Sequence, residues 1–199
     1  MELLVIRHGL PLRIERDDGA PADPELSELG QRQAERVAEW LKDEPIEAIY
    51  ASPLHRAHQT AMPLAAAKGL PIQLEPGIVE FNPDAQSYIP LEELKATDPE
   101  AWRALVQGGL HAEIDFDLFR QTVVSSLERI IAANPSRVVA VVCHGGVINS
   151  WVAHILGIDT PLFFDPTYTS INRSLAASSG ERMVVSLNET AHLRGLARG

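Results

Sequence analysis

Two histidines follow directly after apolar, β-branched runs in this chain. His8 comes after the run 2–6 and Arg7, and His144 comes after the run 138–143. Residues that follow parallel strands gather at the carboxyl edge of an open α/β sheet, where such folds bind ligands. An imidazole that is held through one ring nitrogen can attack phosphorus through the other. This placement therefore indicates chemistry on a phosphate group.

Two arginines are placed to bind the phosphoryl group. The planar fork of an arginine matches the oxygens of a phosphate. Arg7 follows the first apolar run, and Arg56 follows a strand predicted over 46–51 and lies near the start of a helix. The amide of Gly145 opens the helix after the second histidine, where the helix dipole favours an anion. We expect these groups to meet at one edge of the sheet, although Arg7 alone could be a buried ion-pair partner of a carboxylate.

The hydrophobic periodicity predicts strands that alternate with helices. Strands are expected over 2–6, 46–51, 70–74, 138–142, 175–177 and 183–187, and helices after Ser27, from 54 to Gly69, over 115–133 and over 147–156. This alternation predicts an α/β fold: a three-layer sandwich with a central, mostly parallel sheet and helices on both faces. The long segment from about 75 to 115 lacks a regular period, which is typical of a functional excursion. Its aromatic residues either form a small core or face the substrate: Phe81, Tyr88, Trp102, Phe116 and Phe119.

The composition limits the class of protein. With 199 residues and 45% hydrophobic content, we expect one domain over 1–199. A net charge of −10 disfavours nucleic acid and anionic membranes as partners. No apolar run approaches the length of a membrane span, and Cys143 is the only cysteine, so we expect a cytoplasmic protein without disulfides. His55 and His58 lack carboxylates at matching spacing, so no metal site is predicted, and a homodimer is compatible with the sequence.

Four motifs occur in a specific order. They are Arg7-His8-Gly9, the segment LSELGQRQA at 26–34, the segment SPLHRAHQTA at 52–61 and His144-Gly145-Gly146. In this order they resemble the histidine phosphatase superfamily, the phosphoglycerate-mutase-like group, and the resemblance runs from residue 2 to about 190. It implies that His8 is a nucleophile that forms a phosphohistidine, which water then hydrolyses. It also implies a phosphate pocket of Arg7, Arg56 and His144, with no metal or cofactor.

The general acid is the position that the resemblance fixes least. The family uses a carboxylate in the segment after the third strand, which implies Glu80, and such an acid needs a raised pKa. The residues after it depart from the family's aromatic-glycine pattern, so Asp84 is a rival. Leu10-Pro11 and the short chain also depart from the mutases. The sequence therefore predicts a metal-independent phosphomonoesterase for a small phosphorylated substrate. A mutase and a non-catalytic phospholigand-binding protein are the alternatives.

Overall fold

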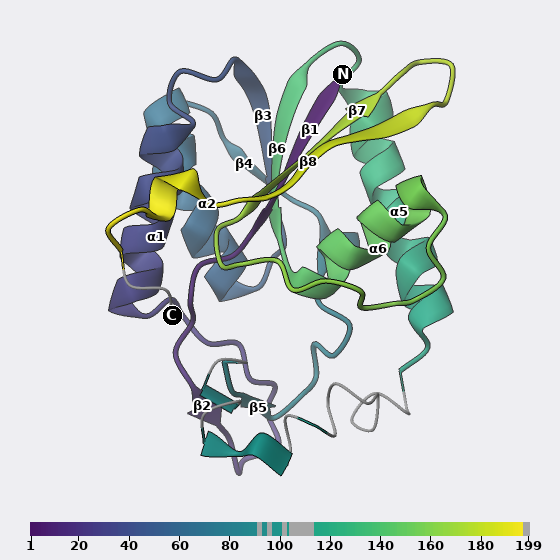
Figure 1. Cartoon of the computed structure of the whole chain (residues 1–199). Coiled ribbons are helices and arrows are strands. Elements are labelled where there is room, and N and C mark those ends of the chain that lie inside the picture. Colours follow the sequence, from purple (N-terminus) through teal and green to yellow (C-terminus); the bar gives the residue numbers. More distant parts are fainter. Residues whose placement is uncertain (91–92, 95–96, 101–102, 104–113, 197–199) are drawn as a thin grey trace.

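A six-stranded sheet forms the centre of the computed structural model (Figure 1), which describes residues 1–90, 93–94, 97–100, 103 and 114–196. The strand order is β4-β3-β6-β1-β7-β8, and the first four strands are mutually parallel, whereas β7 is antiparallel to both of its neighbours. The mostly parallel sheet predicted from the sequence is therefore confirmed. The strands are β1 (Glu2–Arg7), β3 (Ile46–Ala51), β4 (Ile72–Leu74), β6 (Val138–Cys143), β7 (Ile171–Ala176) and β8 (Arg182–Glu189).

Helices cover both faces of the sheet, as predicted. On one face lie α1 (Glu28–Trp40) and α2 (His55–Lys68), and on the other lie α5 (Phe116–Ala133) and α6 (Gly145–Leu156) (Figure 1). Alternate residues of β1 enter the two cores, because successive side chains of a strand point to opposite faces. Leu4 packs with α1 and α2, whereas Leu3 packs with α5 and α6. The result is the three-layer arrangement.

Side chains and glycines at the helix ends fix these boundaries. Ser27 caps α1, and its Oγ accepts a hydrogen bond of 3.0 Å from the amide of Gly30. Asp115 caps α5 in the same way through the amide of Leu118, at 2.9 Å. At Gly69 a φ of 64° ends α2, a conformation that glycine adopts without strain. These ends lie within one or two residues of the predicted ones.

A small second sheet was not predicted from the sequence. It pairs β2 (Ile14–Glu15) with β5 (Ser87–Tyr88) beyond the carboxyl ends of β1 and β6 (Figure 1). Two-residue strands are too short to produce a periodic signal, so both segments were expected to be irregular. The short 3-10 helices η1 (Pro76–Ile78) and η3 (Ala191–Leu193) complete the described elements. Trp102 and residues 104–113 of the excursion lie outside the described residues.

None of the helices within the described ranges has the length and hydrophobicity that crossing a membrane requires.

Candidate active site

His8 lies directly after β1, at the carboxyl edge of the sheet. Its side chain is buried, and its backbone amide donates to the carbonyl of Cys143 at 2.9 Å. The ring nitrogen Nδ1 lies 2.8 Å from the carbonyl oxygen of Gly9. A carbonyl only accepts hydrogen bonds, so Nδ1 carries a proton, and the neutral ring then has its lone pair on Nε2. In its neutral form His8 therefore has an available nucleophilic nitrogen.

His144 lies beside His8, with the two ring centroids 5.1 Å apart. It occupies the N-cap position of α6 and is fully buried. Its Nε2 lies 2.8 Å from the hydroxyl of Ser52, which follows β3, whereas its Nδ1 makes no hydrogen bond to the described residues. The sequence placed Ser52 in a motif without giving it a role. A hydroxyl residue in the turn directly after a strand is the feature of the sequence that could have indicated this contact.

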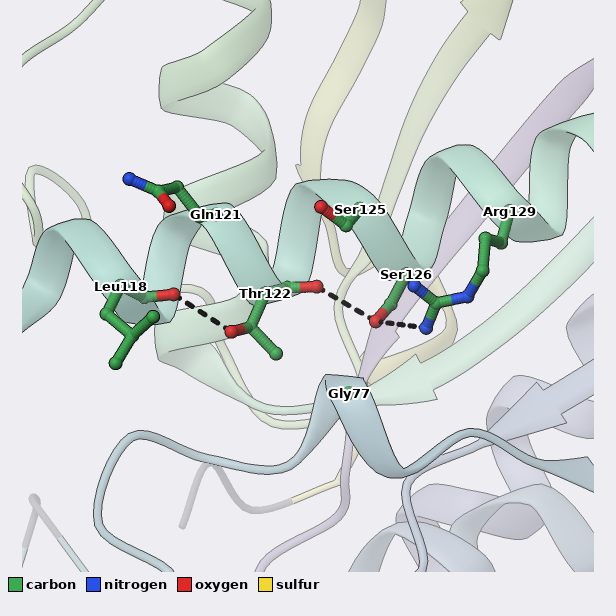
Figure 2. Close-up of a pocket in the computed structure, with 7 residues that line it drawn as sticks. All are labelled: Gly77, Leu118, Gln121, Thr122, Ser125, Ser126 and Arg129. Atoms are coloured by element: carbon green, nitrogen blue, oxygen red, sulfur yellow. Dashed lines mark hydrogen bonds between the residues drawn. The ribbon is translucent and has the colours of Figure 1, made fainter.

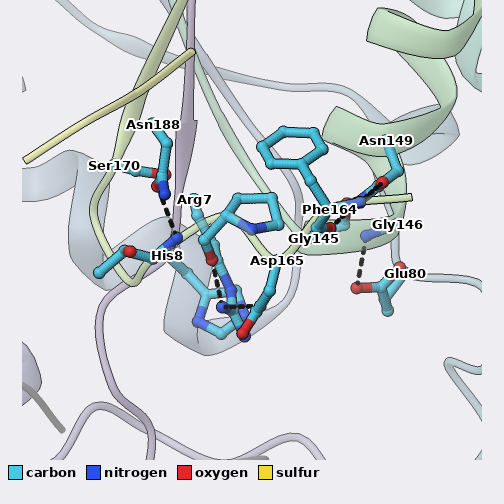
Figure 3. Close-up of polar contacts among 12 residues, drawn as sticks. Arg7, His8, Glu80, Gly145, Gly146, Asn149, Phe164, Asp165, Ser170 and Asn188 are labelled. Atoms are coloured by element: carbon cyan, nitrogen blue, oxygen red, sulfur yellow. Dashed lines mark hydrogen bonds and ion pairs between the residues drawn. The ribbon is translucent and has the colours of Figure 1, made fainter. Parts of the chain in front are cut away.

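Arg7 is the last residue of β1, and its guanidinium lies beside His8 (Figure 3). Its Nη1 lies 3.3 Å from Oδ1 of Asp165 and also donates to the carbonyl of Pro166. The Arg7 Cζ lies 4.0 Å from the ring centroid of Tyr168, within the range of a cation–π interaction. These partners come from the loop before β7, which carries no periodic pattern and was not singled out from the sequence.

Arg56 approaches the same site from the first turn of α2. It is buried, with 3% of its surface exposed, and its Cζ lies 4.8 Å from the ring centroid of Tyr88. Neither Nε nor Nη1 of Arg56 forms a hydrogen bond with a residue that the structure describes. Buried guanidinium donors of this kind can bind an oxyanion. Arg7, His8, Arg56 and His144 together form what we call the phosphate pocket.

Thr60 links the loop after His8 to the helix that carries Arg56. Its hydroxyl accepts a hydrogen bond of 2.9 Å from the Gly9 amide and donates one of 2.6 Å to the Arg56 carbonyl. A Cβ at Gly9 would lie 2.6 Å from the carbonyl oxygen of Gly30, so only glycine fits there. Thr60 belongs to the motif at 52–61, yet its contact became visible only in the folded chain.

Glu80 lies at the N-terminus of α6, next to the phosphate pocket (Figure 3). Its Oε1 accepts from the Phe81 amide at 3.1 Å, and its Oε2 accepts from the Gly146 amide at 3.2 Å. Burial raises the pKa of the Glu80 carboxyl, and the amide hydrogen bonds and the charges of Arg56 and Arg7 lower it by less. The rival residue, Asp84, is exposed. Glu80 therefore has the environment that a general acid requires.

Both histidines of the phosphate pocket are held neutral. Burial lowers the pKa of His8 well below its usual value, and the charges of Arg56 and Arg7 lower it further. The pKa of His144 is lowered mainly by burial as well, and next by Arg56 and His8. A histidine must be neutral to act as a nucleophile. The arginines thus supply positive charge for a phosphate while keeping His8 reactive.

The aromatic residues of the excursion divide into two groups. Phe81 packs against Phe116 and Phe119, with ring centroids 5.5 and 5.9 Å apart, and forms a small core. Tyr88 instead faces the phosphate pocket, with its ring centroid 6.4 Å from that of His8. A hollow of about 720 Å³ lies beside Glu80, between the segment 79–84 and the start of α5. The excursion therefore reaches the site through Tyr88 and the surroundings of Glu80.

A second, smaller pocket of about 380 Å³ lies between η1 and α5 (Figure 2), and none of its lining residues belongs to the phosphate pocket. Arg129 donates to Ser126 Oγ at 2.9 Å and to Glu75 Oε1 at 3.1 Å there. A Cβ at Gly77 would lie 1.9 Å from Ser126 Oγ. These contacts pack η1 against α5, so we assign this pocket to the structure of the fold rather than to the chemistry.

The remaining candidate residues take structural places. His55 is exposed and contacts Asp23, and within the described part of the chain no group of three or more His, Cys, Asp or Glu residues could hold a metal ion. Cys143 is buried in the core with α5 and α6, as predicted, and burial raises the pKa of its thiol. His192 contacts Thr169, with 3.1 Å between Nε2 and Oγ1. None of these residues lines the phosphate pocket.

Comparisons with known proteins identify the family of this chain. The sequence profile of the histidine phosphatase superfamily (branch 1) matches residues 3–190. Phosphoserine phosphatase 1 of Hydrogenobacter thermophilus is 30% identical over 176 residues, which cover 86% of this chain and 83% of that protein. Phosphoglycerate mutase-like protein 4 of Arabidopsis thaliana is 32% identical over 157 residues, which cover 75% and 68% of the two chains.

Solved structures show the same fold. The YhfR protein of Bacillus stearothermophilus superposes with a TM-score of 0.78 at 22% identity, and the match covers 96% of this chain and 98% of that one. Phosphoserine phosphatase from Entamoeba histolytica, in complex with 3-phosphoglyceric acid, superposes with a TM-score of 0.72 at 25% identity and the same coverage. The phosphoglycerate-mutase-like α/β fold expected from the motifs is therefore confirmed.

Proposed function

The chain belongs to the histidine phosphatase superfamily, and from this premise we propose that it is a metal-independent phosphomonoesterase that acts through a phosphohistidine at His8. One observation carries the proposal. His8 donates through Nδ1 to the Gly9 carbonyl, which leaves Nε2 as a buried nucleophile among Arg7, Arg56 and His144. A nucleophile and fixed positive donors are what phosphoryl transfer requires.

In the first step the lone pair of His8 Nε2 attacks the phosphorus, and the bond from phosphorus to the ester oxygen breaks. Arg7, Arg56, His144 and the amide of Gly145 bind the non-bridging oxygens, where negative charge must be held in the transition state. The protonated carboxyl of Glu80 gives its proton to the departing ester oxygen. Its raised pKa supports this role, since an acid must hold its proton until the bond breaks.

In the second step water hydrolyses the phosphohistidine. The Glu80 carboxylate formed in the first step takes a proton from the water, whose oxygen attacks the phosphorus. The bond from phosphorus to Nε2 breaks, inorganic phosphate leaves, and Glu80 is protonated again for the next turnover. The same carboxyl group thus acts first as acid and then as base, so no further proton carrier is needed.

The substrate is proposed to be a small phosphorylated metabolite. Relatives are named phosphoserine phosphatase, one of them a metal-independent phosphoserine phosphatase of Arabidopsis thaliana that is 30% identical over 161 residues. The phosphate pocket binds only the part that all phosphomonoesters share. We therefore assign the choice of organic group to the segment of about 75–115, which brings Tyr88 to the site. The cytoplasmic location and the homodimer stay predictions.

Mutase activity is the second candidate, because other relatives are named probable phosphoglycerate mutase, such as one of Erwinia tasmaniensis that is 29% identical over 164 residues. A mutase would move the phosphoryl group to another position of the substrate instead of releasing it. A protein that only binds phospholigands is disfavoured by Glu80, because binding alone does not require a carboxyl with a raised pKa beside the Gly146 amide.

The test is phosphate release from p-nitrophenyl phosphate and from a panel of sugar, nucleotide and phospho-acid monoesters, with EDTA present. We expect release that EDTA does not reduce and that His8→Ala abolishes. His154→Ala is the matched control, because His154 stacks on Trp151 outside the phosphate pocket. Transfer without release would favour the mutase. Phosphate binding without turnover of any substrate would contradict the enzymatic proposal.

A further inference from the structure

Asp23 contacts the arginine that α2 brings to the phosphate pocket. Its Oδ1 lies 3.5 Å from Nη1 of Arg56, and among the described residues it is the only carboxylate that forms an ion pair with this arginine. The side chain of Asp23 is 27% exposed, whereas that of Arg56 is 4% exposed. Asp23 therefore lies at the rim of the pocket, with Arg56 between it and the interior.

The same carboxylate also caps the helix that carries Arg56. The N-cap residue of α2 is Leu54, which has no side-chain oxygen to offer. Asp23, from the loop before α1, takes over that role, because its Oδ1 and Oδ2 lie 2.9 and 3.2 Å from the amide of His55. A carboxylate at a helix N-terminus satisfies a free amide and is favoured by the helix dipole.

The charge of Asp23 has the wrong sign for binding phosphate. A carboxylate near a phosphate pocket weakens the attraction for an anion. Its presence beside Arg56 has a geometric explanation instead: it caps α2 and forms an ion pair with one side of the guanidinium, whose Cζ also lies over the ring of Tyr88. An arginine that is held in place loses less side-chain entropy when it binds a phosphate.

We propose that Asp23 is a positioning residue that orients Arg56 for the phosphoryl group. This inference rests on the proposed function. On charge alone, removing a carboxylate from the rim of an anion site should strengthen anion binding. The positioning role predicts the opposite, a weaker affinity for phosphate. A role in tuning charge and a role in positioning can therefore be separated by the direction of one measurement.

The test measures the Kd of inorganic phosphate by calorimetry, together with kcat and KM for p-nitrophenyl phosphate. Asp23→Ala removes both the cap and the ion pair, and we expect it to weaken phosphate binding about tenfold. Asp23→Asn keeps an oxygen that can accept from the His55 amide, so it should recover most of the affinity. Asp18→Asn is the matched control, because Asp18 lies in the same loop but pairs with Arg16 at the surface.

Three results would overturn the inference. Tighter phosphate binding by both Asp23 variants would show that the residue only tunes charge. Unchanged Kd and KM with a lower Tm would show that it only stabilises the helix. A Kd in Asp18→Asn that weakens as much as in Asp23→Ala would show that the effect is not specific to the contact between Asp23 and Arg56. If the wild-type protein itself bound no phosphate, the proposed function would fail as well. The wild type therefore tests the proposed function, whereas the Asp23 variants test only the role of Asp23.

Discussion

His8 and His144 are held through opposite ring nitrogens, with their centroids 5.1 Å apart. Nδ1 of His8 donates to the Gly9 carbonyl, whereas Nε2 of His144 pairs with the Ser52 hydroxyl. If the hydroxyl donates in that pair, His144 carries its proton on Nδ1, which makes no hydrogen bond within the described residues. His8 then presents a lone pair, which a nucleophile requires. His144 presents an N–H donor, which a group that binds an oxyanion requires.

Replacing Ser52 with alanine should therefore impair catalysis through His144. Without the hydroxyl, His144 loses the partner that sets its tautomer, and a buried ring nitrogen is left without a hydrogen bond. We expect kcat/KM for p-nitrophenyl phosphate to fall about ten- to a hundredfold, which corresponds to about 1–3 kcal/mol. Ser52→Thr keeps a hydroxyl and should restore part of the activity. Equal losses in the two variants, with the fold intact by circular dichroism, would contradict a role for the hydroxyl.

Replacing Glu80 with glutamine should produce a loss that depends on the leaving group. An acid is needed most when the departing oxygen is a poor leaving group, and proton donation contributes about 10²- to 10⁴-fold to such steps. We expect a large fall in kcat/KM for an alkyl phosphate and a much smaller one for p-nitrophenyl phosphate. Asp84→Asn is the control. A leaving-group-dependent loss in that variant instead would identify Asp84 as the acid.

The pH dependence follows from the direction of the pKa shifts. Phosphorylation of His8 needs Glu80 protonated, so kcat/KM should be lost as the pH rises through the raised pKa of Glu80. It also needs His8 neutral, and the lowered pKa of His8 places that loss on the acid side, well below its usual value. Comparing the wild type with Glu80→Gln on one substrate removes the effect of substrate ionisation. A basic limb that survives unchanged in Glu80→Gln would contradict the assignment.

The sequence predicted those site residues whose position follows from the residues next to them in the chain. Arg7, His8 and His144 could be placed because each follows an apolar run, and the carboxyl ends of parallel strands meet at one edge. Arg56 could be placed by the same reasoning, with the ordered motifs as support. Glu80 could be named only from the resemblance, because nothing in the residues around it predicts its contact with the Gly146 amide.

The partners of these residues could not be predicted, since they come from loops without periodicity. Asp23 meets Arg56 across 33 positions of the chain, and Tyr88 is brought to the same arginine by a two-residue strand. Asp165 and Tyr168 reach Arg7 from the loop before β7, more than 150 positions away. Such contacts depend on tertiary packing, which local patterns do not specify.

His192 should make the folded state sensitive to acid. Burial lowers its pKa to about 4, although its contact with Thr169 opposes the shift. The unfolded chain binds a proton near the usual pKa of about 6.5, so the free energy of unfolding decreases as the pH falls from there towards 4. The full effect of this residue is at most about 3 kcal/mol.

His8 and His144 add to the same trend, so the wild type must be compared with His192→Gln, which keeps an N–H donor for Thr169 but does not titrate. We expect urea unfolding to show a flatter dependence on pH between 4 and 6.5 in the variant, and parallel curves would show that folding does not lower the pKa of His192.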